Sequence, residues 1–308
     1  MYNNESQYRE IFEHLSRLGL AFKDASMANY TTFACGGKAD ILLIPQNKNE
    51  SLSAILQYLA GKDVPVCVIG GGSNLLVGDK GIRGVVIAIR ATHGLEGRVS
   101  LEDDSTVYAD AIVKKSYFIE ACTSFSLGGV EFMAGIPGCI GGGIAMNAGT
   151  DTGVFSNILK SIVYCKRDGE LCNTEDIKTE YRNLFIDEGA VICGAYFKLP
   201  ADDSAKTKKN IDDILKARAS KHPLEYPSAG SVFKNPEGEA AWKLINDAGL
   251  RGKRVGGAMV SEKHTNFIVN CDEAKAADVK ELIELIQATI MEKFSIKMET
   301  EIKLIGEF

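Results

Sequence analysis

The glycines of this chain are concentrated in two short stretches. Of the 31 glycines among 308 residues, fifteen fall within Gly70–Gly84 and Gly128–Gly153. Glycine lets a chain turn tightly, and it lets successive backbone N–H groups approach one anion without a Cβ in the way. The first stretch directly follows an apolar, strand-like run, Val64–Ile69. Two interpretations are open at this point: a backbone cradle for a long ligand that carries phosphates, or tight turns in a strand-rich protein.

Neither of two common nucleotide-binding motifs accounts for these glycines. The dinucleotide fingerprint G-x-G-x-x-G needs a sixth-position glycine, but Leu75 stands there counting from Gly70, and Met146 counting from Gly141. The P-loop needs Ser or Thr after Gly-Lys, and no Gly-Lys pair in this chain is followed by either. Consecutive glycines followed by the polar pair Ser73-Asn74 still suit an anion without either motif.

The overall composition is that of an ordinary globular protein. Apolar residues make up 45% and charged residues 25%, and the length suggests about two domains. This mix excludes a disordered, collagen-like or coiled-coil chain. The net charge of −6 offers no basic surface for nucleic acid, and nothing in the sequence implies a protein partner.

The chain shows no targeting or membrane-spanning segment. Its first residues are polar and acidic, unlike a signal peptide. The longest uncharged stretch, Phe132–Thr150, contains six glycines and Pro137, so we expect loops and turns there and no membrane insertion. These features predict a cytoplasmic protein.

The cysteines and histidines do not suggest a metal site. None of the eight cysteines forms C-x-x-C, and the four histidines are scattered along the chain. Most cysteines lie in apolar runs, which is typical of buried, reduced thiols. We therefore expect no metal.

The periodicity of the apolar residues predicts an α+β fold rather than a doubly wound sheet, because the strands do not alternate regularly with helices. Helices are expected at 8–18, 52–59, 211–219, 241–248 and 279–290. Strands are expected at 39–44, 64–69, 84–89, 106–113, 161–166, 191–198, 264–270 and 296–304. The polar residues 200–210 lack periodicity and predict a domain boundary.

Several blocks of residues, in order over nearly the whole chain, carry a resemblance to one family. The blocks are Asn29–Phe33 with Gly36–Asp40; Gly70–Val77 with Asp79 and Gly81; Glu131, Ala134–Gly138, Gly141-Gly142 and Met146–Gly149; Tyr181-Arg182; Pro227–Pro236; Ala248–Leu250; and His264–Asn270. Together they resemble the UDP-N-acetylenolpyruvoylglucosamine reductase (MurB) family. The short spacing between Arg182 and Ser231 is similar to the branch that lacks an inserted tyrosine loop.

The resemblance implies a three-part chain that binds FAD in a domain of the vanillyl-alcohol-oxidase (PCMH) type. Residues 1–66 would form an N-terminal α/β part of the FAD-binding region, 67–198 the FAD-binding domain, and 199–308 an α+β substrate domain whose last strand, about 296–308, returns towards the FAD. The implied FAD contacts are Gly70, Gly71, Gly72, Ser73, Asn74, Leu75, Ala134, Gly135, Ile136, Pro137, Gly138, Gly141, Gly142, Met146, Asn147, Ala148 and Gly149.

The resemblance also implies a reaction in two half-reactions, with NADPH as co-substrate. NADPH would reduce the FAD, and flavin N5 would then deliver hydride to C3 of UDP-N-acetylenolpyruvoylglucosamine, giving UDP-N-acetylmuramate for peptidoglycan synthesis. Ser231 matches the proton donor to C2, Arg182 the residue that stabilises the developing carboxylate charge, and Glu301 a residue that assists at C2. Two further positions match substrate contacts, Asn235 and Lys303.

Some residues and alternatives remain open. Arg218, Lys221 and His222 could meet the substrate diphosphate or the flavin, or form a solvated basic run. The chain departs from the family pattern at Ala34-Cys35, Leu184 and Thr150–Gly153. The alternative functions are another FAD-dependent oxidase or dehydrogenase of the same cofactor fold, and a non-catalytic nucleotide-binding protein.

Overall fold

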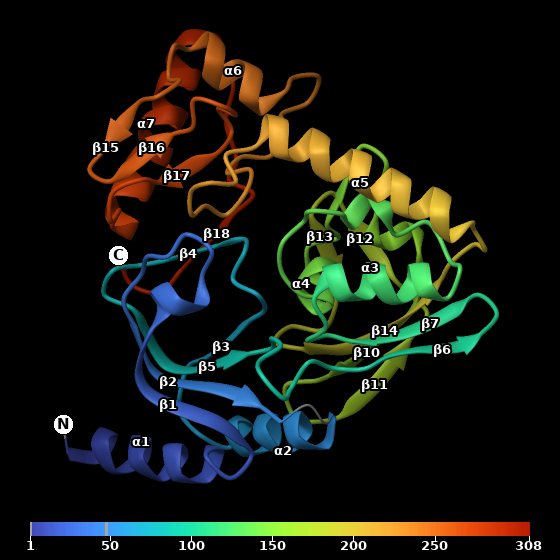
Figure 1. Ribbon diagram of the computed structural model, residues 1–308. Helices are drawn as coiled ribbons and strands as arrows, with labels where there is room; N and C mark the ends of the chain where they lie inside the picture. The colour runs from blue at the N-terminus through green and yellow to red at the C-terminus, as the bar shows by residue number, and fades with distance from the viewer. Residues whose placement is uncertain (1, 47–48) are drawn as a thin grey trace. The chain divides into compact units, whose positions relative to one another are not determined.

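The computed structural model describes residues 2–46 and 49–308, which divide into two compact units (Figure 1). The first unit comprises the residues up to Lys23 together with Ile41–Gly71 and Gly84–Lys216, and the second comprises Asp24–Asp40, Gly72–Arg83 and Ala217–Phe308. Each unit is therefore assembled from segments that are distant in the sequence. The resemblance divides the chain by function into three parts, and this division differs in kind from the two compact units. It stays a prediction.

Three strands pass from one unit into the other. They are β1 (Gly19–Ser26), β2 (Lys38–Pro45) and β5 (Ile82–Ala88), and with β3 (Val66–Ile69) they form a sheet in the order β1-β2-β5-β3. In the first unit, β3 runs parallel to β5, with Val66 opposite Val85. The first glycine stretch begins where β3 ends, as the sequence predicts.

The first unit also contains an antiparallel five-stranded sheet with helices on its sides. Its order is β11 (Leu171–Thr174), β10 (Leu159–Cys165), β14 (Val191–Lys198), β7 (Thr106–Asp110) and β6 (Val99–Asp103). In Figure 1, α3 (Lys115–Ser124) and α4 (Ile140–Ala145) lie on one side of this sheet and α2 (Asn49–Ala60) on the other. Its core includes Phe118 and Phe197, whose ring centroids lie 4.7 Å apart.

In the second unit, a three-stranded sheet packs against a long helix. The sheet order is β15 (Arg254–Val255), β16 (Ala258–Val260) and β17 (Ile268–Asn270). The helix α7 (Ala276–Phe294) packs on β15 and β16, and α6 (Ala241–Asp247) packs on α7. The Asp79 carboxylate accepts hydrogen bonds from the N–H groups of Ala276 and Ala277, both at 2.9 Å, and so satisfies donors at the start of α7.

The remaining elements are short, apart from the N-terminal helix. They are α1 (Tyr2–Leu15), η1 (Met27–Tyr30), β4 (Leu75–Val77), η2 (Glu131–Met133), β8 (Gly149–Thr150), β9 (Gly153–Val154), η3 (Phe155–Asn157), β12 (Lys178–Glu180), β13 (Asn183–Phe185) and β18 (Lys303–Ile305). The last strand, β18, pairs in parallel with β4, with Lys303 opposite Leu75. Within the second unit, the end of the chain therefore lies beside the residues that follow Asn74.

The mixture of helices and strands confirms the α+β class, but some expected strands are shorter than predicted, two of them by more than half. The expected strand 264–270 forms a ladder only in β17, and the expected strand 296–304 only in β18, at Lys303–Ile305. The alternation at 296–304 reflects burial instead, because Met298 and Ile302 are each 2% exposed. An extended segment can bury alternate side chains without a continuous partner strand.

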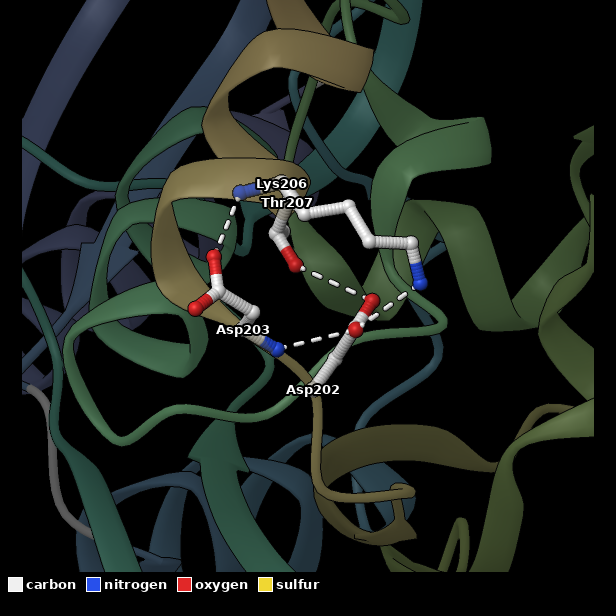
Figure 2. Close-up of polar contacts among 4 residues, drawn as sticks. All are labelled: Asp202, Asp203, Lys206 and Thr207. Atoms are coloured by element: carbon white, nitrogen blue, oxygen red, sulfur yellow. Dashed lines mark hydrogen bonds and ion pairs between the residues drawn. The ribbon is translucent and has the colours of Figure 1, made fainter.

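The polar segment 200–210, where the sequence predicts a domain boundary, is largely helical, and the boundary itself stays a prediction. Residues Ser204–Lys221 form the 18-residue helix α5, so most of the polar segment is helical. Figure 2 shows how it begins: Asp203 accepts the N–H of Lys206 at 2.8 Å, and Asp202 contacts Lys206 Nζ at 3.0 Å and Thr207 Oγ1 at 3.3 Å. Capping carboxylates and charge pairs support a helix that is polar on most sides, and such a helix leaves no apolar periodicity to detect.

The second glycine stretch is also not made only of loops. The helix α4 carries Gly141, Gly142 and Gly143. A Cβ on Gly141 would lie 2.8 Å from the Cβ of Ala111, and one on Gly143 would lie 2.8 Å from Lys115 Cε. These glycines therefore let α4 pack closely against its neighbours in the first unit.

One lysine is buried beneath the second glycine stretch. Lys115 is 4% exposed, and its Nζ donates a hydrogen bond of 2.7 Å to the carbonyl oxygen of Pro137. Burial disfavours the charged form and lowers the pKa of Lys115 to about 8. At neutral pH this side chain is still mostly protonated, so the first unit holds a buried positive charge.

We predict that Lys115→Met changes how the free energy of unfolding depends on pH. The unfolded chain holds the lysine proton up to the ordinary pKa of 10.5, whereas the folded chain releases it near 8, so folding becomes more favourable as the pH rises between these values. The free energy of unfolding of the wild type minus that of Lys115→Met should therefore rise by about 2 kcal/mol between pH 7 and pH 9.5.

Urea unfolding at both pH values measures this difference. Lys114→Met is the matched control, because Lys114 is the neighbouring lysine in the sequence and is exposed in the folded chain. A difference for Lys115→Met that does not vary with pH would contradict the buried charge.

Candidate functional site

In the first unit, the start of the first glycine stretch packs on the second. A Cβ on Gly71 would lie 2.8 Å from the Cα of Gly138, and one on Gly70 would lie 3.1 Å from Cys139 Sγ. A side chain at Gly71 would therefore push the two backbones apart. Beside this contact is a cavity of about 620 Å³, lined by Gly71 and by the run Met133–Cys139.

The cavity combines an apolar lining with a few cationic groups. Apolar side chains come from Ile112 and Ile119 on one part of the chain and from Ile211 and Leu215 of α5 on another. The cationic groups are Arg90, Lys114 and Lys208. Such a volume and lining are typical of a cofactor site.

Six of the expected FAD residues line this cavity, namely Gly71, Ala134, Gly135, Ile136, Pro137 and Gly138. Gly141 and Gly142 lie in α4, and Met146, Asn147, Ala148 and Gly149 follow it. The three cationic groups are absent from our sequence prediction. They lie far apart in the chain and have no shared motif, so no sequence signal could have grouped them.

Residues 72–83 of the first glycine stretch belong to the second unit. Gly72 has a φ of +69°, and a Cβ there would overlap the carbonyl oxygen of Tyr30, so only glycine fits. The side-chain amide of Asn74 donates to the main-chain carbonyl oxygen of Glu301 at 3.0 Å. The main-chain carbonyl oxygen of Asn74 accepts the N–H of Lys303, also at 3.0 Å. An expected cofactor residue thus contacts the backbone of two expected active-site residues.

The second unit also brings the loop of Ser231 to Glu301. The N–H of Glu301 donates to the carbonyl oxygen of Val232 at 2.7 Å, and Ser231 itself pairs with Phe267 on the other side. The side chains of Ser231 and Glu301 are both partly exposed. Two residues that are 70 positions apart in the sequence are therefore held within one backbone hydrogen-bond network.

A buried asparagine fixes the serine loop. The Asn266 side chain is 4% exposed, and it donates to the carbonyl oxygen of Phe233 at 2.8 Å and accepts the N–H of the same residue at 3.0 Å. Asn266 is part of the block His264–Asn270, to which the sequence analysis assigned no role. Asn266 follows two other polar residues, His264 and Thr265, so the sequence pattern does not single it out.

Arg182 stands in a two-residue hairpin loop of the first unit. The hairpin pairs Glu180 of β12 with Asn183 of β13, and Arg182 adopts a left-handed φ of +60°, which costs a non-glycine residue roughly 1–2 kcal/mol. Its guanidinium carbon lies 4.9 Å from the ring centroid of Tyr181. Leu184, a departure from the family pattern, is 8% exposed and belongs to the core of this unit, so that position anchors the hairpin through apolar packing.

Two other departures lie at turns of the backbone. Thr150 and Gly153 pair across a tight turn in the hairpin of β8 and β9. Ala34 has a left-handed φ of +55°, and Cys35 is buried with its carbonyl oxygen accepting the hydroxyl of Thr31 at 3.1 Å.

The two expected substrate residues are exposed in the second unit. The side-chain oxygen of Asn235 accepts the N–H of Ala241 at 3.0 Å, which helps to start α6. Lys303 is exposed on β18.

Arg218 and His222 belong to a partly buried cluster near Ser231. The rings of His222 and His264 lie 5.4 Å apart, and both lie within 5.0 Å of the Phe267 ring. Burial, followed by the charge of Arg218, lowers the pKa of His222 to about 4, and burial also lowers the pKa of His264, so both are neutral at pH 7. Among the described residues, no hydrogen-bond partner is found for three buried nitrogens, Arg218 Nε, His222 Nδ1 and His264 Nδ1.

Lys221, the third basic residue left open by the sequence, is exposed.

Within residues 2–46 and 49–308, no group of three or more His, Cys, Asp or Glu side chains is placed to hold a metal ion. No helix in the described part of the chain has the length and apolarity needed to cross a membrane.

Comparison with protein-family models gives two matches. Residues 222–305 match the C-terminal domain of UDP-N-acetylenolpyruvoylglucosamine reductase, and residues 39–175 match an FAD binding domain. The second range contains the cavity-lining run Met133–Cys139 and all of the expected FAD contacts.

Curated relatives cover nearly the whole chain. UDP-N-acetylenolpyruvoylglucosamine reductase of Agathobacter rectalis is 41% identical over 99% of this chain and 100% of the relative. The reductase of Clostridium novyi is 38% identical over 91% of both chains, and that of Geobacter metallireducens is 40% identical over 94% of this chain and 95% of the relative.

A solved structure agrees with these relatives. The crystal structure of UDP-N-acetylenolpyruvylglucosamine reductase (MurB) from Thermus caldophilus superimposes with a TM-score of 0.77 at 30% identity, covering 94% of this chain and 99% of that one. The family resemblance, the flavin-binding fold and FAD as the cofactor are thereby confirmed. The chain belongs to the UDP-N-acetylenolpyruvoylglucosamine reductase (MurB) family and is an FAD-dependent oxidoreductase.

Proposed function

We propose that this chain uses NADPH to reduce UDP-N-acetylenolpyruvoylglucosamine to UDP-N-acetylmuramate, in cytoplasmic synthesis of peptidoglycan precursors. The observation that carries the proposal is the backbone hydrogen bond between Glu301 and Val232, which holds the expected acid Glu301 beside the loop of the expected proton donor Ser231. The relatives that cover the whole chain are named for this reduction.

The residues of the first unit suit the cofactor. When bound, FAD accepts hydride from NADPH and delivers it to C3 of the enolpyruvyl group. The cavity beside the close backbones of Gly71 and Gly138 has room for a flat or extended group. Arg90, Lys114 and Lys208, which line it, supply positive charge for the diphosphate of the cofactor.

The protein's own contribution to the chemistry is charge and a proton. Reduction at C3 leaves negative charge spread from C2 into the carboxylate, and the planar fork of Arg182 can bind that carboxylate through two parallel hydrogen bonds. Ser231 Oγ then gives its proton to C2, because even a weak acid protonates a much more basic carbon. Glu301 assists this proton transfer from the segment that hydrogen-bonds to the serine loop.

We predict that Ser231→Ala leaves flavin reduction by NADPH within about twofold of wild type but slows flavin reoxidation by the UDP-enolpyruvyl sugar by at least about a hundredfold, since only the second step needs the proton. Anaerobic rapid-mixing absorbance of the flavin measures both steps separately. Ser228→Ala, in the same loop, is the matched control and should leave both rates unchanged.

Equal losses in the two steps would refute the assignment of Ser231 as proton donor. A wild-type flavin that NADPH reduces but that the UDP-enolpyruvyl sugar does not reoxidise would refute the function itself. Reoxidation by oxygen, after reduction by a simple alcohol, would then favour the alternative of an oxidase.

The cluster around Arg218 is the best place for the diphosphate of the substrate. Its buried nitrogens are without protein partners in the described residues, and leaving a buried donor unsatisfied costs about 1–3 kcal/mol. An anionic oxygen beside Arg218 would satisfy the guanidinium, and the cluster adjoins Phe267, which pairs with Ser231.

We predict that Arg218→Gln raises the KM for the UDP sugar by about tenfold or more, the usual loss when a charge-assisted hydrogen bond is removed, with little change in flavin reduction by NADPH. Steady-state kinetics together with single-turnover flavin reduction make this measurement. Lys216→Gln, an exposed cation on the same helix, is the control. An unchanged KM in Arg218→Gln would exclude the diphosphate from this cluster.

A further inference from the structure

We propose that Asn147 is a positioning residue that sets the hairpin of Arg182. The proposal rests on the function proposed above, because it gives Arg182 a role in binding the substrate carboxylate. The sequence predicts a cofactor contact at Asn147, which stays a prediction, and the structure shows in addition that its side chain makes hydrogen bonds within the protein.

The side-chain amide of Asn147 joins two segments of the first unit. Asn147 is 7% exposed, its Oδ1 accepts the N–H of Ser156 at 3.0 Å, and its Nδ2 donates to the carbonyl oxygen of Glu180 at 3.2 Å. Glu180 is the residue directly before the hairpin loop Tyr181-Arg182. The amide therefore connects the segment that follows α4 to the base of the arginine loop.

This hydrogen bond acts where the backbone is strained. Arg182 has a φ of +60° and Asn147 a φ of +37°, and both lie in the left-handed region. Asparagine tolerates this region better than most residues, whereas arginine keeps such a conformation only when its surroundings enforce it. On the hairpin itself, Leu184 packs into the core, and the bond from Asn147 fixes the other strand at Glu180.

The consequence for the reaction is geometric. Asn147 lies within Met146–Gly149, among the expected flavin contacts, so one side chain links the flavin segment to the residue that would hold the substrate carboxylate. A displacement of about 1 Å at such a residue can slow a reaction by up to about a hundredfold. The Asn147 amide would thereby keep Arg182 in register with the flavin segment.

The first test compares Asn147→Asp with Asn157→Asp in the FAD-loaded enzyme. Aspartate at 147 still accepts from Ser156 but places a carboxylate oxygen against the Glu180 oxygen. Asn157 is the matched control, because its Oδ1 accepts the N–H of Val154 at 3.0 Å in the neighbouring segment and aspartate keeps that bond. We expect Asn147→Asp to slow flavin reoxidation by the UDP sugar about tenfold or more, with flavin reduction by NADPH and FAD affinity within about twofold, and Asn157→Asp to change none of the three.

Two readouts separate positioning from a general structural role. Hydrogen exchange of the hairpin amides at 180–183 should become faster in Asn147→Asp and not in Asn157→Asp. In a chain that already carries Arg182→Lys, Asn147→Asp should slow flavin reoxidation little further, because both changes disturb the same contact.

The outcomes are distinguishable. If Arg182→Lys leaves reoxidation unchanged, the proposed role of Arg182 is wrong, and with it this inference. Suppose that Arg182→Lys slows flavin reoxidation. If Asn147→Asp alone does not slow it, or if the two variants combined slow it by the full product of their separate effects, the role of Arg182 stands and Asn147 does not position it. Should Asn147→Asp lose FAD or fail to fold, Asn147→Gly, which keeps the left-handed backbone without the amide, replaces it; loss of FAD or fold there too would make Asn147 a general structural residue and overturn the proposal.

Discussion

The cavity of the first unit, where we propose that FAD binds, depends on the close approach of two backbones. Gly71 and Gly138 approach so closely that a Cβ on the first would lie 2.8 Å from the Cα of the second. The cavity is lined by Gly71 and by the run Met133–Cys139, so a side chain at this contact would separate the strand-end loop from the segment that faces it. Glycine at position 71 is therefore a packing requirement, and main chain forms part of a wall that also carries side chains such as Ile112 and Ile119.

Asparagine amides hold the segments that carry the three proposed catalytic residues. In each case the side chain donates to a backbone carbonyl oxygen on or beside the segment: Asn266 to Phe233 near Ser231, Asn74 to Glu301 itself, and Asn147 to Glu180 beside Arg182. An amide can donate and accept at once, so one side chain can hold two backbone segments together. The three proposed catalytic residues thus lie on short segments whose backbone accepts a hydrogen bond from a side-chain amide.

The sequence predicted some elements better than others, for physical reasons. The sequence predicted β14, which is buried on both faces, and the amphipathic helix α7 closely. In both, the buried positions must be apolar, so burial produces a pattern that can be recognised in the sequence. The start of α5 was missed, since a helix supported by caps and ion pairs carries no apolar stripe. At the tail, Met298 and Ile302 alternate like a strand because they bury side chains, although only Lys303–Ile305 joins a ladder.

By itself, the sequence determined the family, the cofactor and the α+β class, because motifs and glycine requirements are local properties of the chain. The tertiary structure decided what those motifs touch. Asn74 meets the backbone of Glu301 across 227 residues, three unrelated cations surround the glycine-lined cavity, and Lys115 is buried beneath Pro137. Contacts of this kind arise from strand pairing and packing between distant segments, which leave no periodic trace in the residues that make them.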